Sequence, residues 1–63
     1  TKQEAIQALK EGRKVRHKWF SNDEYLYMEN GELYDEVCTC LPFDEFFELR
    51  SGKDWEDGWL IID

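Results

Sequence analysis

The chain has no hydrophobic run close to the length of a membrane-spanning helix, and its first residues hold no apolar signal core. A span needs roughly 20 apolar residues, and a secretory signal needs an apolar segment near the N-terminus. We therefore expect no membrane association and a location inside the cell, with Thr1 following a removed initiator methionine. At 63 residues the chain is long enough for one domain, residues 1–63.

Cysteine and histidine are scarce. The two cysteines lie in Cys38-Thr39-Cys40, where a disulfide would close a small, strained ring, so we expect two reduced thiols. A structural zinc site uses about four ligands, and the single histidine, His17, leaves that set incomplete. We expect no metal and no other cofactor. Small domains that lack these supports often associate into oligomers.

Signals of an active site are also weak. The chain has no Ser-His-Asp spacing and no Gly-rich phosphate loop, and the acids around Cys38 and Cys40 disfavour a reactive thiolate. With 15 Asp and Glu, pairs of carboxylates arise by chance, and glycosidase-type pairs need a cleft that so short a chain would struggle to build. We expect no enzymatic activity and no catalytic residue.

Positive charge is scarce but concentrated. The chain has 8 Lys and Arg against 15 Asp and Glu, for a net charge of −7, and half of the cations lie in residues 13–18, directly before Trp19 and Phe20. The acidic balance argues against binding long nucleic acids, which requires a broad basic face. Because Arg suits phosphate and aromatic rings stack on bases, the cluster favours one small, nucleotide-like anion.

The pattern of apolar residues predicts an α+β fold, with one N-terminal helix packed on a small, mostly antiparallel sheet. Thr1 and Glu4 fit a capping box, and Ala5, Ile6, Ala8 and Leu9 then share one helical face. The expected elements are a helix over 2–11 and strands over 13–18, 24–29, 32–37 and 59–62. Val15 is expected to face the helix, which leaves Arg16 and Lys18 on the other face of the sheet.

Asn30-Gly31 is a strong signal for a type I′ hairpin. A two-residue turn there sets the register, and the pairs are Glu29 with Glu32, Met28 with Leu33, Tyr27 with Tyr34, Leu26 with Asp35 and Tyr25 with Glu36. One face then holds Leu26, Met28, Leu33 and Val37, and the other holds Tyr25, Tyr27 and Tyr34. No second helix is expected over the tyrosines, so they mark a ligand site, an oligomer interface or both.

The last third of the chain gives less certain signals. Residues 38–42 are expected to form a loop. The Phe-rich segment 43–50 is ambiguous and favours a strand over 46–50. Ser51 and Asp54 fit a second capping box for one helical turn through Trp55, which ends at Gly58. Trp55 and Trp59 are expected in the core, and His17 on the surface.

Seven residues are candidates for binding the ligand. Arg16 and Lys18 would meet phosphate, and Asn22 would read the edge of a base. The aromatic candidates for stacking on bases are Trp19, Phe20, Tyr25 and Tyr27. The alternative for Arg16 and Lys18 is that they balance nearby Glu residues across the sheet.

The chain resembles the small phage-encoded sponge proteins of the Thoeris anti-defense family and its anti-CBASS relatives. Many of these begin with E-A-L-x-x-L-K-x-G-K-x-V-x-R, continue to a Trp with an Asn nearby, and end near S-x-x-D…D-W-x-V. The matching stretches here are residues 4–16 (EAIQALKEGRKVR), Trp19 with Asn22, and Ser51-x-x-Asp54 followed by Asp57 and Trp59. The middle of this chain is shorter than in many members, and Lys18 stands where a small residue is common.

The resemblance implies a homo-oligomer that binds a cyclic nucleotide immune signal at subunit interfaces, without cleaving it, in the cytoplasm of an infected bacterial host. Arg16, Trp19 and Asn22 match its motif, and Trp59 matches a structural Trp. The ligand would be a cyclic dinucleotide such as 3′3′-cGAMP, favoured for so compact a chain, or a cyclic ADP-ribose isomer. Acidity favours an alternative function, an acidic protein that inhibits a basic host DNA-handling protein. A structural module without either activity is the third possibility.

Overall fold

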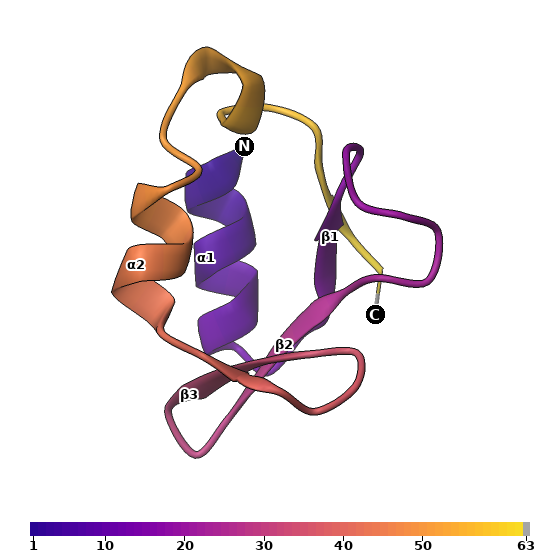
Figure 1. The fold of residues 1–63 in the computed structure, drawn as a ribbon, viewed down its shortest axis with the longest axis vertical. Coiled ribbons are helices and arrows are strands. Elements are labelled where there is room, and N and C mark those ends of the chain that lie inside the picture. The colour runs from indigo at the N-terminus through magenta and orange to yellow at the C-terminus, as the bar shows by residue number, and fades with distance from the viewer. Residues whose placement is uncertain (63) are drawn as a thin grey trace.

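The computed structural model describes residues 1–62, which form an α+β fold (Figure 1). Five antiparallel strands form one sheet in the order β4-β3-β2-β1-β5, and both α-helices lie on the same side of it. The elements are α1 (Lys2–Lys10), β1 (Val15–His17), β2 (Leu26–Glu29), β3 (Glu32–Asp35), β4 (Cys40–Leu41), α2 (Phe43–Glu48), the 3-10 turn η1 (Lys53–Trp55) and β5 (Trp59–Ile61). The predicted fold class is confirmed. Within residues 1–62, no helix has the length and apolarity to cross a membrane.

Helix α1 begins with the expected capping box. The amide of Glu4 donates to Oγ1 of Thr1 at 3.2 Å, and the N-terminal amine of Thr1 donates to Oε1 of Glu4 at 2.8 Å. The apolar face buries Ala5, Ala8 and Leu9 against the sheet. Capping and amphipathic spacing agree, and the predicted helix is confirmed to within one residue.

The β2–β3 hairpin has the predicted turn and register. Asn30 and Gly31 both have positive φ, 54° and 79°, as a type I′ turn requires, and four predicted pairs form, from Glu29 with Glu32 to Leu26 with Asp35. The strands are shorter than expected, because Oδ1 of Asp35 accepts from the amides of Val37 and Thr39 and turns the chain. The predicted place of Val37 on the aliphatic face is therefore wrong, and its side chain is 70% exposed.

Segment 38–50 differs from the prediction. Cys40 and Leu41, placed in a loop, pair with Tyr34 and Leu33 as β4. The predicted strand over 46–50 is wrong, because Phe43–Glu48 is the helix α2. The spacing of Phe43, Phe46 and Phe47 puts the three rings on one helical face, and the ring centroids of the first two lie 4.9 and 5.1 Å from that of Phe47.

The C-terminal segment closes the sheet. The 3-10 turn η1 has Gly52 as its N-cap, with no side-chain capping bond, so the capping box predicted from Ser51 is wrong. Gly58 follows the turn with φ of 94°. The predicted strand at 59–62 is confirmed as β5, which pairs with β1 and places Trp59 opposite His17.

The core lies between the sheet and the two helices, and it includes a residue that was expected on the surface. The largest fully buried side chains are those of Val15, Leu9 and Leu33, together with His17, which is 0% exposed. The surface placement of His17 is wrong because residues two apart on a strand share a face, and Val15 already points inward. Trp59 is buried and Trp55 packs against the core, as predicted.

Candidate functional site

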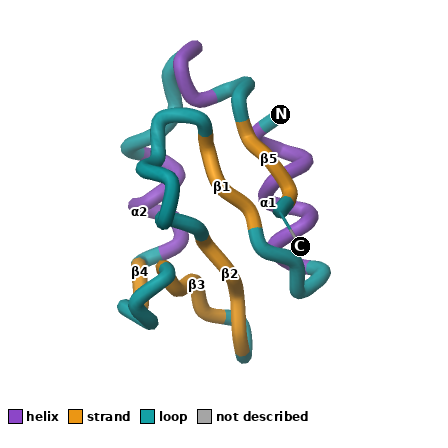
Figure 2. Tube along the Cα trace, turned by 90° about the vertical axis from the view of Figure 1, so that its right-hand side faces the viewer, coloured by secondary structure: helices purple, strands orange, loops and turns teal. Residues whose placement is uncertain are grey.

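The outer face of the sheet carries Arg16 together with tyrosines, as expected from strand alternation, whereas Lys18 lies in the turn after β1. Figure 2 looks onto this face, with the helices behind the strands. Val15 and Leu26 are buried neighbours in the sheet, so the residues next to them, Arg16 and Tyr27, point outward. The rings of Tyr27 and Tyr34 lie 5.5 Å apart. Within residues 1–62 no helix covers this face.

Arg16 is bound to the loop that follows its own strand. Its guanidinium donates to the backbone oxygens of Phe20 and Ser21 at 3.2 Å each and of Asn22 at 3.4 Å. The carbonyl of Asn22 is thus engaged by Arg16, while its side chain is exposed. Arg16 therefore fixes the loop that leads from β1 to β2, and much of its donor capacity is used inside the chain.

Lys18 and Trp19 directly follow β1 in the chain and lie beside Gly58 and η1. Nζ of Lys18 sits 5.3 Å from the centroid of the Trp19 ring, and Nε1 of Trp19 donates to the backbone oxygen of Asp54 at 3.3 Å. The Trp19 side chain is 61% exposed. These two candidates form their own exposed cation–π pair, separate from the remaining aromatic candidates.

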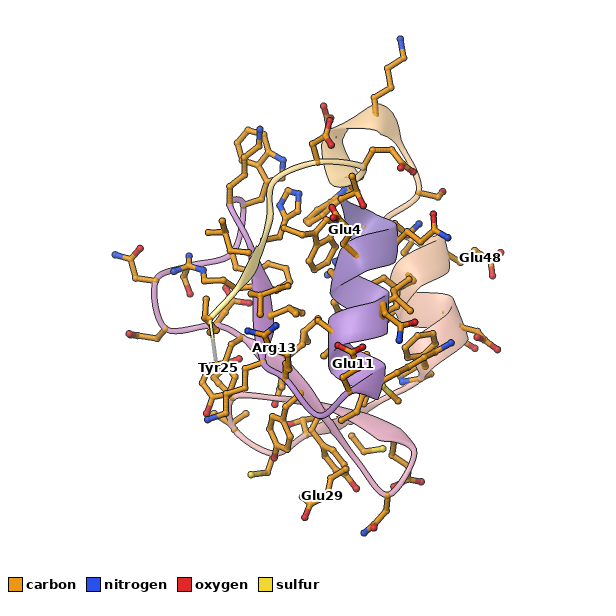
Figure 3. The ribbon with its side chains drawn as sticks, turned by 180° about the vertical axis from the view of Figure 1, so that it is seen from behind. Glu4, Glu11, Arg13, Tyr25, Glu29 and Glu48 are labelled. Carbon is orange, nitrogen blue, oxygen red and sulfur yellow. The ribbon has the colours of Figure 1, made fainter. Side chains whose placement is uncertain are left out.

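Phe20 and Tyr25 line a hollow of about 220 Å³ between the β1–β2 loop, the adjoining ends of β2 and β3, and α2. Its walls also include residues that were not predicted to bind a ligand: Glu24, Leu26, Asp35, Glu36, Leu41, Phe46 and Arg50. Tyr25 lies on the side of the sheet away from α1 (Figure 3). The hollow thus combines aromatic rings, three carboxylates and one guanidinium.

Arg50 lies against aromatic rings at one wall of the hollow. Its guanidinium carbon is 3.9 Å from the ring centroid of Phe46 and 5.3 Å from that of Trp55, and Nη1 donates to the backbone oxygen of Phe46 at 3.3 Å. Partial burial lowers the pKa of Arg50, and the charge of Glu24 opposes that shift. Packing against two rings and a hydrogen bond to the backbone restrict the orientation of this guanidinium.

Two of the carboxylates are held by the chain itself. Oε1 of Glu24 accepts from the amide of Ser21 at 3.0 Å and from its hydroxyl at 2.8 Å, and these bonds lower the pKa of Glu24. Oδ1 of Asp35 accepts the two loop amides described above. Glu36 is half-buried at the wall of the hollow. Each carboxyl group therefore keeps at least one oxygen available to a ligand.

Lys14, a cation that was not predicted as a site residue, lies beside the hollow. Nζ of Lys14 lies 5.1 Å from the centroid of the Tyr25 ring, so that Tyr25 contacts a cation and lines the hollow at once. Strand alternation could have identified Lys14, since it shares a face with Arg16. Arg50 could have been identified only after segment 43–48 was recognised as a helix.

Comparisons of this chain with models of known protein families, with curated proteins and with solved structures find no match.

Cys38 and Cys40 are free thiols and both are exposed. Across residues 1–62, no three His, Cys, Asp or Glu side chains are grouped so that they could hold a metal ion. The hollow and the outer face of the sheet beside it form the candidate functional site.

Proposed function

We propose that this chain is a phage anti-defense protein that binds and sequesters a cyclic nucleotide immune signal without cleaving it. One observation carries the proposal: a single hollow combines the rings of Phe20, Tyr25 and Phe46 with the guanidinium of Arg50. Flat aromatic walls favour a nucleobase through stacking, which is worth about 1–3 kcal/mol per base. The motif resemblance at both ends of the chain supports the same assignment.

In this proposal the base enters the hollow and the phosphate lies at the outer face. Lys14 contacts the ring of Tyr25 from that face, so it would meet the phosphate. Arg16 would act by holding the carbonyls of residues 20–22, which keeps Phe20 and Glu24 in place. Tyr27 extends the aromatic surface beyond Tyr25, at a ring distance of 6.2 Å.

A second copy of the chain would complete such a site. On the outer face, Leu60 of β5 stands opposite Arg16 of β1 and is 52% exposed, so an apolar side chain lies across β1 from the tyrosines. Apolar and aromatic side chains gathered on one face are typical of subunit interfaces. A homo-oligomer joined there would enclose ligands between subunits, as the resemblance implies.

A thermal-shift screen against cyclic dinucleotides and cyclic ADP-ribose isomers tests the proposal. A ligand that binds the folded state raises the melting temperature by mass action. Heat release of a stabilising ligand, followed by chromatography, should return it intact. A cleaved product would make the chain an enzyme, and no shift with any of the nucleotides would overturn the proposal.

The Arg16→Ala variant sharpens this test. The variant should lose ligand binding because the loop is released, while its circular dichroism spectrum stays that of the wild type. Lys10→Ala, an exposed cation on α1, is the matched control and should bind normally. Retained affinity in a folded Arg16→Ala protein would contradict the role given to Arg16.

A basic protein partner is the second candidate, and one observation favours it. Helix α2 exposes Asp44, Glu45 and Glu48 next to Leu49, whose side chain is 81% exposed, and Glu48 projects away from the body of the molecule (Figure 3). An acidic helix with an apolar residue beside it suits a basic surface. Salt-sensitive capture of one basic host protein, unaffected by nucleotides, would support this function.

A further inference from the structure

The hollow is lined by a hydrogen-bond donor group, the guanidinium of Arg50, and by carboxylate acceptors. Within residues 1–62, Arg50 donates one hydrogen bond, to the backbone oxygen of Phe46, although a guanidinium carries five N–H groups. Its Nε is among the buried atoms that have no partner. The acceptors are the carboxylates of Glu24, Asp35 and Glu36.

Among residues 1–62, these opposite charges line one hollow without forming an ion pair within 4.0 Å. Glu24 and Arg50 influence each other's pKa through their charges. They do not form an ion pair, however; the ion pair found within residues 1–62 joins the N-terminal amine to Glu4. Donor groups of Arg50 and carboxylate oxygens that are not bonded to each other suit a ligand that accepts on one edge and donates on another. Since Phe20, Tyr25 and Phe46 also line the hollow, that ligand is flat and aromatic.

Guanine has this arrangement of polar groups. Its O6 and N7 are adjacent acceptors, which a guanidinium engages in bidentate fashion. Its N1–H and 2-amino groups are adjacent donors, which match the two oxygens of a carboxylate. Adenine instead carries the donor N6–H₂ where guanine has O6, so that in the same pose it would direct a donor at Arg50.

We propose that the hollow is a guanine-reading site, in which Arg50 binds O6 and N7 while Glu36 and Glu24 accept from N1–H and the 2-amino group. The inference rests on the proposed function for the rest of the ligand, and it deepens that function by naming the base. It selects guanine-containing cyclic dinucleotides over cyclic ADP-ribose isomers, whose base is adenine.

Isothermal titration calorimetry with cyclic di-GMP and cyclic di-AMP tests the inference on the intact chain. The two probes have the same backbone and charge and differ only in the base. One good bidentate base contact discriminates by about 1–3 kcal/mol, so cyclic di-GMP should bind between about 5-fold and about 150-fold more tightly. Equal affinity, or tighter binding of cyclic di-AMP, would overturn the guanine assignment.

Single-atom changes in the ligand locate the contacts. Cyclic di-IMP lacks the 2-amino group and should bind more weakly than cyclic di-GMP. The Glu36→Gln variant should reduce this difference, because the amide offers one acceptor where the carboxylate offers two. Glu45→Gln, a change at an exposed carboxylate on α2 outside the hollow, is the matched control and should leave both affinities unchanged.

The Arg50→Lys variant tests the donor side. Lys keeps the charge but lacks the planar fork, so the preference for cyclic di-GMP over cyclic di-AMP should fall at least about fivefold, in line with the loss of one bidentate contact. An undiminished preference in the folded variant would overturn the role of Arg50. If this variant fails to fold, the Glu36→Gln comparison decides the assignment without it.

The results separate this inference from the proposed function. Equal binding of the two dinucleotides, both recovered intact, keeps the sponge and overturns guanine reading. Preferential binding of cyclic di-GMP followed by its cleavage supports guanine reading and overturns the sponge. No binding of either dinucleotide, at concentrations where the folded protein is stable, overturns the inference.

Discussion

The backbone N–H of Trp19 donates a 3.1 Å hydrogen bond to Nδ1 of the buried His17 ring. Because Nδ1 accepts, the ring is neutral and carries its proton on Nε2, which donates to the backbone oxygen of Asp57 at 2.7 Å. The ring centroid also lies 4.3 Å from that of Trp55 and 4.9 Å from that of Trp59. One imidazole therefore joins the end of β1, the turn η1 and the start of β5.

Replacing this ring should be costly. His17→Ala should lower the free energy of unfolding by about 3 kcal/mol or more, because it leaves a cavity among aromatic rings and removes the partner of two backbone groups. Urea denaturation followed by tryptophan fluorescence measures the loss. Lys18→Ala, at the exposed neighbour, should cost far less, and similar losses for the two variants would contradict a central role for His17.

Gly58 should not tolerate a side chain. Its φ is 94°, and a Cβ there would meet Cδ of Lys18 at 2.9 Å and Nε2 of His17 at 3.1 Å. Gly58→Ala should therefore destabilise the fold by about 1–3 kcal/mol through backbone strain and crowding. Gly52→Ala is the matched control in a thermal melt, since its Cβ would meet nothing within 4 Å. A wild-type melting temperature for Gly58→Ala would show that the turn has another conformation.

The loop that forms one wall of the hollow should loosen in acid. The amide and hydroxyl of Ser21 hold the pKa of Glu24 below its usual value. The stabilisation is fully present above the unfolded-state pKa and is lost as pH falls through the lower folded-state pKa. Titration of the Glu24 carboxyl carbon by NMR should show this shift, and Ser21→Ala should move the pKa back upward. An identical titration in the variant would contradict the assignment.

Tyr27 should resist ionisation on the outer face. Its O–H donates to Sγ of Cys38 at 3.2 Å, and this bond is the main cause that raises the pKa of Tyr27 to about 12. The stabilisation is complete below the unfolded-state pKa and is lost as pH rises through about 12. Cys38→Ala should lower the pKa of Tyr27, as measured by ultraviolet absorbance of tyrosinate. Cys40→Ala should leave the shift in place, and the reverse pattern would contradict the geometry.

The elements that could be predicted are those whose signals are local. Asn30-Gly31 fixes a turn and, through it, the register of two strands, and the Thr1–Glu4 box fixes the start of α1. The prediction for segment 43–48 failed because a short Phe-rich run fits a strand or a helix equally well until the core that it faces is known. The prediction that Ser51 caps the turn failed because the N-cap lies one residue later, at Gly52.

The candidate site was predicted only in part, for a related reason. Phe20 and Tyr25 lie near the basic segment in sequence, and both line the hollow. Arg50 reaches the same hollow from the far end of α2, and nothing local in the sequence relates it to Tyr25. The burial of His17 likewise depends on β5, which is distant in sequence and supplies Trp59 as its neighbour.

The pairing of β5 with β1 determines when the protein can fold during its synthesis. The α1 helix and the β2–β3 hairpin are local and can form while the nascent chain is still short. Val15 and His17 gain their second neighbouring strand only once residues 59–61 have left the ribosome. Until then β1 pairs with β2 alone, so the sheet and the helices become one cooperative unit only after β5 has been synthesised.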